Sequence, residues 1–133
     1  MIGQIEGGLC ALVGVTHGDT EAEAVRLADR LVKLRVMPDE QGRPNRSVLD
    51  TAESILVISQ FTLYADTRRG NRPGYTDAAE PAVAEPLIDS VVERIKSHGV
   101  KVSTGRFGAN MDVRLLNQGP ITILLDIDGQ ATG

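Results

Sequence analysis

Asn117-Gln118-Gly119-Pro120-Ile121-Thr122 stands between two apolar runs, residues 111–116 and 121–127, and both runs have the composition of β-strands. Pro120 has no backbone donor and a fixed φ, so it favours a turn or the edge of a sheet. Gly119 can adopt backbone angles closed to other residues, and it lets another molecule approach the main chain closely. A Gly-Pro pair on its own usually marks no more than a tight turn. The stretch therefore predicts a turn between two strands and leaves a binding role open.

The composition is that of one globular domain. A chain of 133 residues with 41% hydrophobic and 24% charged residues can build a single core. Its net charge of −4 gives no overall attraction to nucleic acid, so any RNA contact needs a local basic patch. The single cysteine, Cys10, lies in an apolar run and is expected to be buried. No run is long enough to span a membrane or typical of a signal segment, which favours a cytoplasmic protein.

Two segments show helical periodicity. Leu27, Leu31 and Leu34 recur at helical spacing behind Asp19, a good N-cap residue, and they predict a helix over about residues 20–35. A second helix is predicted over residues 82–98, with either a later start or a bend at Pro86. The other apolar segments are predicted strands, at residues 2–5, 9–15, 55–64, 100–103, 111–116 and 121–127.

The order of these segments favours a compact single α+β domain. Several strands follow one another across short turns, and only two main helices are present, so we expect mostly antiparallel strands rather than a doubly wound α/β sheet. Residues 1–127 are the expected domain and residues 128–133 a flexible tail.

A conventional catalytic set is missing from the sequence. His17 lies in the turn before the first predicted helix, and His98 ends the second, where a cation is placed favourably against the helix dipole. Neither has a nucleophile near it in sequence, and no Cys/His spacing is typical of a metal site. The sequence therefore predicts neither a metal nor a cofactor.

A second segment, Ser59-Gln60-Phe61-Thr62-Leu63, gives the Gly-Pro stretch a context. Together the two segments resemble the D-aminoacyl-tRNA deacylase family, also called D-tyrosyl-tRNA deacylases. The resemblance extends over residues 3–126 and includes further matches at Gly14-Val15, Gly18-Asp19, Arg72-Pro73 and Gly105-Arg106-Phe107-Gly108-Ala109 with Met111. It implies a layered β/β/α arrangement and a homodimer.

Members of this family hydrolyse the ester that joins a D-amino acid to the terminal adenosine of tRNA. The resemblance implies that Gly119-Pro120 forms a Gly-cisPro element, which enters the active site of the dimer partner and holds the substrate α-ammonium through its carbonyls. An L-amino acid held in the same way would push its side chain into the turn, so selection would act by exclusion. Glycine has no side chain to exclude, and glycyl-tRNA is a further expected substrate. We expect the 3′ end of aminoacylated tRNA as the partner, and neither DNA nor a membrane.

The resemblance also implies roles for individual residues. Main-chain N–H groups around Phe61 would stabilise the oxyanion. Thr62 has the only hydroxyl placed like a nucleophile, but no base lies beside it in sequence, so we expect an orienting role, with the ribose 2′-hydroxyl of the tRNA assisting the reaction. The residues implied in catalysis are Ser59, Gln60, Phe61 and Thr62. Those implied in substrate binding are Gly119, Pro120, Asn117, Thr122, Met111, Ala84 and Phe107, although core packing is an alternative for Ala84 and Met111.

Three arginines, Arg68, Arg69 and Arg72, lie in a polar excursion that follows this motif. They are predicted to contact tRNA phosphates, and a solvated basic loop is the alternative.

The start of the chain differs from the family pattern. Family members begin with a further valine-rich strand that carries Gln-Arg-Val, whereas Met1-Ile2-Gly3 matches the strand after it. We therefore expect the domain to lack that strand, and its absence would expose a sheet edge. Two alternative functions stay open: a non-catalytic homodimer of the same fold, and a deacylase with specificity shifted to mischarged L-aminoacyl-tRNA.

Overall fold

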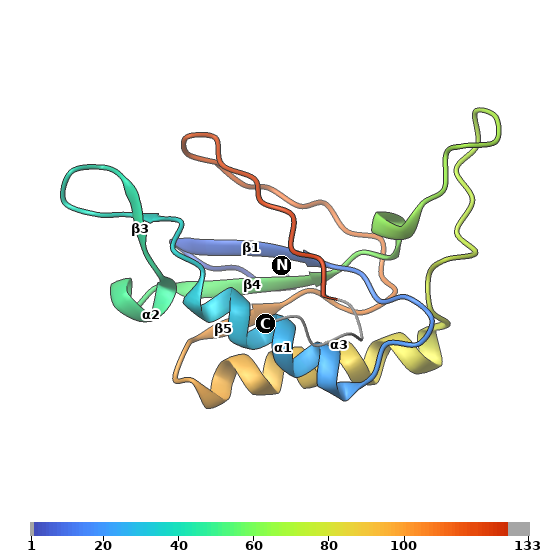
Figure 1. The fold of residues 1–133 in the computed structure, drawn as a ribbon, viewed down its shortest axis with the longest axis horizontal. Coiled ribbons are helices and arrows are strands. Elements are labelled where there is room, and N and C mark those ends of the chain that lie inside the picture. The colour runs from blue at the N-terminus through green and yellow to red at the C-terminus, as the bar shows by residue number, and fades with distance from the viewer. Residues whose placement is uncertain (1, 128–133) are drawn as a thin grey trace.

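The computed structural model describes residues 2–127, and its centre is a small sheet (Figure 1). The predicted tail at 128–133 lies outside the described residues. Three strands form the sheet in the order β1-β4-β5, with bounds β1 (Gly8–Val13), β4 (Ser54–Ser59) and β5 (Val102–Thr104). A separate two-stranded ladder joins β2 (Met37–Pro38) to β3 (Pro44–Arg46).

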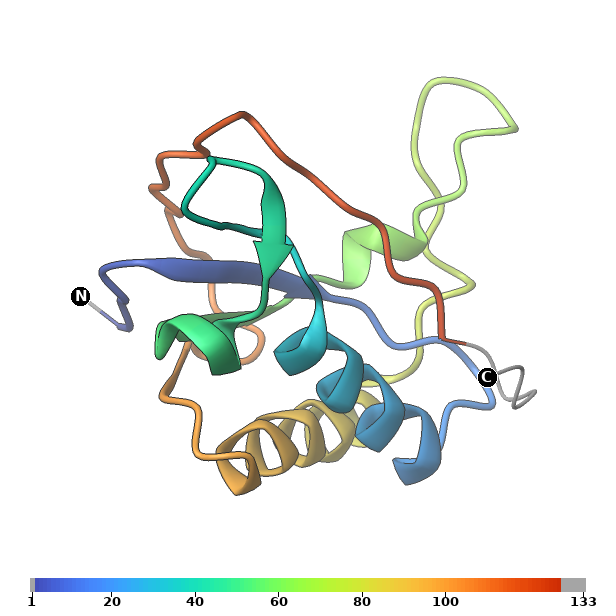
Figure 2. The same cartoon turned by 60° about the vertical axis from the view of Figure 1, so that its left-hand side comes forward.

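Three α-helices and one 3₁₀ helix complete the described fold, and they confirm the α+β class. Their bounds are α1 (Glu21–Lys33), α2 (Val48–Thr51), α3 (Pro81–Ser97) and the 3₁₀ helix η1 (Phe61–Tyr64). The two long helices, α1 and α3, are the two that periodicity predicts. Both lie on the same side of the sheet (Figure 2).

The prediction of mostly antiparallel strands is wrong for the central sheet. β1 pairs with β4 in parallel and β4 pairs with β5 in parallel, and only the short β2–β3 ladder is antiparallel. The physical reason is the connections. A helical crossover brings the chain back to the edge of the sheet at which the previous strand began. The next strand therefore runs in the same direction, and the two strands pair in parallel. α1 lies between β1 and β4, and α3 lies between β4 and β5.

Helix α1 begins one residue later than predicted. Thr20, not Asp19, is the N-cap, and its side chain and that of Glu23 form a capping box. The Asp19 carboxylate instead accepts a hydrogen bond from the Thr16 N–H at 2.9 Å, which closes the preceding turn. Glu23 accepts from both the backbone N–H and the hydroxyl of Thr20, and these hydrogen bonds lower the pKa of its carboxyl.

Helix α3 starts at Pro81 and includes Pro86, so the predicted later start is wrong, and the alternative of a bend at Pro86 stays a prediction. Pro81 occupies the first helical position, where its missing N–H removes no intrahelical hydrogen bond. His98 caps the other end of the helix.

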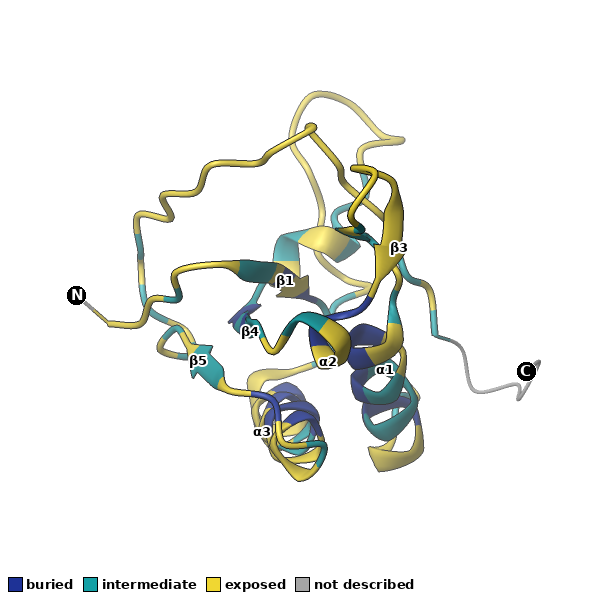
Figure 3. Cartoon of the chain, turned by 90° about the vertical axis from the view of Figure 1, so that its left-hand side faces the viewer, coloured by how far each residue is buried: buried dark blue, intermediate teal, exposed yellow. Residues whose placement is uncertain are grey.

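The core fills the space between the sheet and the two long helices. Alternate strand residues face the helices, because side chains alternate between the two faces of a strand. The buried side chains are aliphatic, as expected from the few aromatic residues: Ala11, Val13, Ile55 and Val57 from the sheet, Ala24, Ala28, Leu31 and Val32 from α1, and Ala84, Ile88, Val91, Val92 and Ile95 from α3. Figure 3 shows that the buried faces of α1 and α3 turn toward each other and the sheet.

The other face of the sheet carries exposed apolar side chains. Because Ala11 and Val13 point to the helices, Cys10 and Leu12 point away from them, and the prediction that Cys10 is buried is wrong. On this side the chain from 111 to 127 runs as an extended excursion rather than as the two predicted strands (Figure 2). Leu116 and Leu124 are 86% and 90% exposed in it. The predicted strand at residues 2–5 is also irregular.

A polar link joins the two long helices on their outer surface. Asp29 of α1 accepts hydrogen bonds from Arg94 Nε of α3 at 2.8 Å and from His98 Nε2 at 2.7 Å. Hydrogen bonding to Arg94, and then to His98, lowers the pKa of the Asp29 carboxyl to about 2.

We expect replacement of Asp29 by asparagine to lower the free energy of unfolding at pH 7 by about 1–2 kcal/mol, less than the full pKa difference because the group is partly solvated. The carboxyl has a lower pKa in the folded state than in the unfolded state, so its contribution is complete above about pH 4 and disappears as the pH falls through 2. Urea unfolding of both proteins at several pH values tests this. Glu93→Gln is the matched control, because Glu93 pairs with Lys96 at 3.6 Å on the exposed surface of α3. An equal effect of both substitutions would contradict a special role for Asp29.

Candidate active site

The Ser59–Thr62 segment occupies the end of the central strand. Ser59 is the last residue of β4, and the chain then enters η1 at Phe61. The Gln60 N–H donates to the carbonyl of Val13 at 2.8 Å, so the segment is fixed to the end of β1. A helix leaves its first N–H groups without partners inside the helix. The first N–H groups of η1 therefore have no partner within the helix.

The hydroxyl of Thr62 has a hydrogen-bond partner in the same segment. The side-chain amide of Gln60 donates a hydrogen bond to Thr62 Oγ1. An amide is not a base that could remove the threonine proton, and activation of a hydroxyl nucleophile needs such a base. This contact is consistent with the predicted orienting role of Thr62.

A groove of about 530 Å³ begins at Ser59 and runs along α3. Phe107, Thr104 and Gly105 form one side of it, and Ile88 and Val92 contribute apolar surface from the helix. Its polar wall comes from a row of charged side chains on α3: Glu85, Asp89, Glu93 and Lys96. The apolar surface suits the aromatic base of a ligand. The carboxylates suit its hydroxyl and amino groups, because a carboxylate accepts hydrogen bonds from such donors.

Met111 and Ala84 occupy different surroundings. Met111 is half-buried, and its Sδ lies 2.9 Å from the position that a Cβ on Gly105 would take, so Gly105 leaves room for it beside the groove. Ala84 is buried in the core on the inner face of α3. Its position agrees with the packing alternative, while its neighbour Glu85 lines the groove.

The Gly119-Pro120 turn is held by the side chain of Asn117. Asn117 Oδ1 accepts from the Ile121 N–H at 3.1 Å, and its amide donates to Thr122 Oγ1 at 3.1 Å. The Gly119–Pro120 peptide bond is cis. Gly119 has φ +124°, and a Cβ at this position would lie 2.8 Å from Ile121 Cγ1. The turn therefore requires glycine, and Asn117 and Thr122 shape it.

The turn and the Ser59–Thr62 segment do not meet within one chain. The orange-to-red excursion reverses direction at the end of the sheet opposite to η1, in both views (Figures 1 and 2). The structure thus brings Ser59 and Phe107 together around the groove, whereas Gly119 and Pro120 lie in an exposed turn elsewhere on the surface.

The three arginines lie in an exposed loop whose base is closed. Asp66 and Gly74 exchange two backbone hydrogen bonds of 2.7 and 2.8 Å. The carboxylate of Asp66 also accepts from the guanidinium of Arg68 at 2.9 Å, and this hydrogen bonding lowers the pKa of Asp66 to about 2. Arg68 is thus partly neutralised, and no ion pair of Arg69 or Arg72 occurs among residues 2–127.

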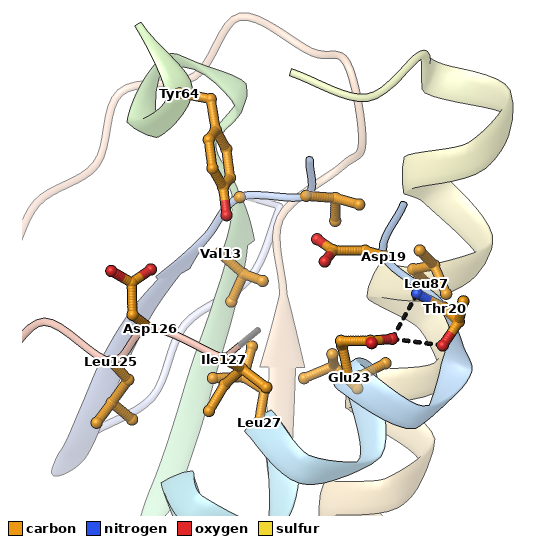
Figure 4. Close-up of a pocket in the computed structure, with 14 residues that line it drawn as sticks. Val13, Asp19, Thr20, Glu23, Leu27, Tyr64, Leu87, Leu125, Asp126 and Ile127 are labelled. Carbon is orange, nitrogen blue, oxygen red and sulfur yellow. Dashed lines mark hydrogen bonds between the residues drawn. The ribbon is translucent and has the colours of Figure 1, made fainter. Parts of the chain in front are cut away.

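A smaller cavity of about 60 Å³ lies between the start of α1, α3 and residues 125–127 (Figure 4). The Tyr64 hydroxyl points into it, with the carboxylates of Asp19 and Asp126 nearby (Figure 4). Burial, and then these two carboxylates, raises the pKa of Tyr64. Glu23 also lines the cavity, but its carboxylate accepts hydrogen bonds from Thr20 at the helix N-cap. This cavity is far smaller than the groove of about 530 Å³, so the groove beside Ser59 is the better candidate for the tRNA end.

Among residues 2–127, no group of three or more histidine, cysteine or acidic side chains is arranged to hold a metal ion. The described helices also include none with the length and apolar character of a membrane span.

The described residues thus form a small α+β domain with a groove at the end of its central strand. Its sequence matches the family described as D-Tyr-tRNA(Tyr) deacylase over residues 1–126. The chain belongs to this family.

Curated relatives support the assignment. A D-aminoacyl-tRNA deacylase of Roseiflexus sp. (strain RS-1) is 56% identical over 126 residues, which cover 95% of this chain and 81% of the relative. One of Brevibacillus brevis (strain 47 / JCM 6285 / NBRC 100599) is 51% identical, with 95% and 87% covered.

Solved structures agree with the fold. The c-Myc DNA Unwinding Element Binding Protein matches with a TM-score of 0.85 at 34% identity, over 94% of this chain and 85% of that one. A structure described as a probable eukaryotic D-amino acid tRNA deacylase has a TM-score of 0.67 over 80% of this chain and 77% of that one, and at 13% identity this likeness concerns the fold alone.

Sequence reasoning missed the acidic row on α3 and the aromatic residue Tyr75. Glu85, Asp89 and Glu93 recur at a spacing of one helical turn, which places them on one side of α3 beside the buried Ile88 and Val92. That spacing is a usable signal. Tyr75 contacts the Phe61 ring, but it lies in an irregular segment, where no periodic pattern in the sequence indicates the contact.

Proposed function

We propose that the protein hydrolyses the ester bond of D-aminoacyl-tRNA and of glycyl-tRNA, releasing the free amino acid and tRNA. The activity is that of a proofreading hydrolase in translation. The observation that carries the proposal is the close likeness to relatives named D-aminoacyl-tRNA deacylase, at 56% identity over 95% of the chain. The groove beside Ser59 and the glycine-dependent turn at Gly119 supply the geometry.

The groove receives the terminal adenosine of the tRNA. The base lies against Phe107 and the apolar side chains of α3, and the carboxylates of the polar wall accept hydrogen bonds from the base and ribose. The ester then lies near Ser59, where the N–H groups at the start of η1 point at the oxygen that gains charge. Removing one such donor from an oxyanion site typically costs about 10²–10³ in rate.

The attacking group is a water molecule, and the bond that breaks joins the carbonyl carbon to the ribose oxygen. Neither histidine serves as a base for it. His17 Nε2 lies 2.6 Å from the Thr76 carbonyl, and His98 is bound to Asp29 on the outer surface. We therefore assign the polar assistance to the 2′-hydroxyl of the tRNA ribose and the orientation of the segment to Gln60 and Thr62.

The Gly119-Pro120 turn acts in the partner subunit of a homodimer. Two features support this arrangement. The turn is exposed and far from η1 of its own chain, and the excursion that carries it exposes apolar side chains that a soluble protein normally covers. In the partner's site the carbonyls of the turn hold the substrate α-ammonium, and the rigid backbone excludes the side chain of an L-amino acid.

The arginine loop contacts the phosphates of the tRNA. Arg69 and Arg72 supply most of the available positive charge there, because Arg68 is paired with Asp66. This local patch matters since the whole chain carries a net charge of −4.

The decisive experiment compares D-tyrosyl-, L-tyrosyl- and glycyl-tRNA as substrates for the purified protein, while sedimentation measures its oligomeric state. Cleavage of the D and glycyl esters, with the L ester at least about 10²-fold slower, is the expected result. A folded dimer that cleaves none of the three would instead support the non-catalytic alternative. Preferential cleavage of the L ester would support shifted specificity.

A further inference from the structure

One aromatic residue outside the motif touches the candidate catalytic segment. The ring of Tyr75 contacts that of Phe61 edge to face, with the centroids 5.0 Å apart and the planes at 70°. This is a favourable geometry for an aromatic pair. Phe61 is 55% exposed, so few other contacts fix its ring.

Tyr75 itself is firmly placed by its neighbours along the chain. On one side, Gly74 is bound to Asp66 by the two backbone hydrogen bonds at the base of the arginine loop. On the other side, the Thr76 carbonyl lies 2.6 Å from His17 Nε2, and the Asp77 carbonyl accepts from the Thr16 hydroxyl at 2.5 Å. The backbone around Tyr75 is therefore bound on one side to Asp66, two residues after η1, and on the other side to the turn before α1.

From this arrangement we propose that Tyr75 is a positioning residue for the deacylase reaction. It holds the Phe61 ring and, through Phe61, the start of η1, where the main-chain donors face the ester. The proposal rests on the proposed function of the Ser59–Thr62 segment. Tyr75 acts through its ring, and its hydroxyl has no part in the effect.

Direct RNA binding by Tyr75 and positioning of Phe61 by Tyr75 would have different effects on the kinetics. A residue that binds RNA directly would affect mainly the KM for aminoacyl-tRNA and would act independently of Phe61. A positioning residue would affect mainly kcat, because a small displacement of reacting groups is costly in rate while the rest of the substrate still binds. Its effect would also depend on the presence of the Phe61 ring.

The test uses Tyr75→Ala and the matched variant Tyr75→Phe in the full-length protein. For D-tyrosyl-tRNA we expect Tyr75→Ala to lower kcat about 5- to 20-fold with KM changed less than about twofold. Tyr75→Phe keeps the ring and should stay within about twofold of the original protein. Combining Tyr75→Ala with Phe61→Ala should lower the rate no further than Phe61→Ala alone.

A second readout does not depend on activity. In NMR spectra the Phe61 ring protons should move when the neighbouring ring is removed in Tyr75→Ala and stay in place in Tyr75→Phe. Unchanged Phe61 resonances in Tyr75→Ala would overturn the proposal, as would an unchanged kcat, additive effects with Phe61→Ala, or a change in KM alone. If the original protein cleaves no ester, the proposed function fails, and the ring resonances decide whether Tyr75 and Phe61 are in the contact that positioning requires.

Discussion

Gly119→Ala should lower the rate of D-tyrosyl-tRNA cleavage by about two orders of magnitude, because displacing a substrate-binding group by about 1 Å can cost that much. Two features of the turn lead to this expectation. The backbone at Gly119 has φ +124°, which other residues rarely adopt, and an added methyl group would lie 2.8 Å from Ile121 Cγ1 and 3.1 Å from the Ile121 N atom. The turn has to change shape, and its carbonyls then point elsewhere.

Gly42→Ala is the matched control for this experiment. Gly42 also has a positive φ, +78°, but nothing lies within 4 Å of the position of an added Cβ. Its substitution also introduces backbone strain, but outside the candidate site, so activity should change less than twofold. Single-turnover rates are measured for Gly119→Ala and Gly42→Ala. A loss of rate in Gly119→Ala alone is due to the changed geometry of the site and not to backbone strain in general. Retention of activity within threefold in Gly119→Ala would exclude the turn from substrate binding.

The largest effect on stability is expected at Ile55. Its side chain lies near the start of the central strand β4 and is fully buried between the sheet and the two long helices. Replacing a buried isoleucine by alanine removes apolar contacts and leaves a cavity, which costs about 2–5 kcal/mol. Ile55→Ala should lower the free energy of unfolding by about 3 kcal/mol within that range.

Urea unfolding measures this difference directly. Leu49→Ala is the control, since Leu49 of α2 is 41% exposed and its truncation should cost less than about 1 kcal/mol. An equal loss of free energy of unfolding in both variants would mean that the space between the sheet and the two long helices is not the main core. Because β4 ends at Ser59, Ile55→Ala should also lower the temperature at which deacylase activity is lost.

The two long helices could be predicted from the sequence, because leucine and valine recur at helical spacing over several turns. Their observed bounds, 21–33 and 81–97, lie within two residues of the predicted 20–35 and 82–98. The direction of the strands was harder. Short apolar segments in a row suggest hairpins, yet the partners in the central sheet are strands separated by helices. Pairing is a property of the whole chain, and local composition does not specify it.

The apolar runs at 111–116 and 121–127 show a related limit. Their composition suits strands, but a strand also needs a neighbouring strand to satisfy its backbone groups. The described residues provide none there, and the runs are irregular and exposed. Of the candidate site, the Ser59–Thr62 segment and the requirement for Gly119 could be predicted from sequence. The contact between Phe61 and Tyr75 could not, because it joins two irregular segments.

The pair of hydrogen bonds between Asp66 and Gly74 has a consequence for how the loop can vary. The two hydrogen bonds hold the ends of the loop of residues 67–73 together. The entropic cost of closing this loop therefore arises on folding and not on binding of RNA. The tip can then gain or lose residues without moving β4 or η1. A graft of a longer or shorter arginine-bearing tip at this position could therefore change tRNA preference while the ester-cleaving segment keeps its shape.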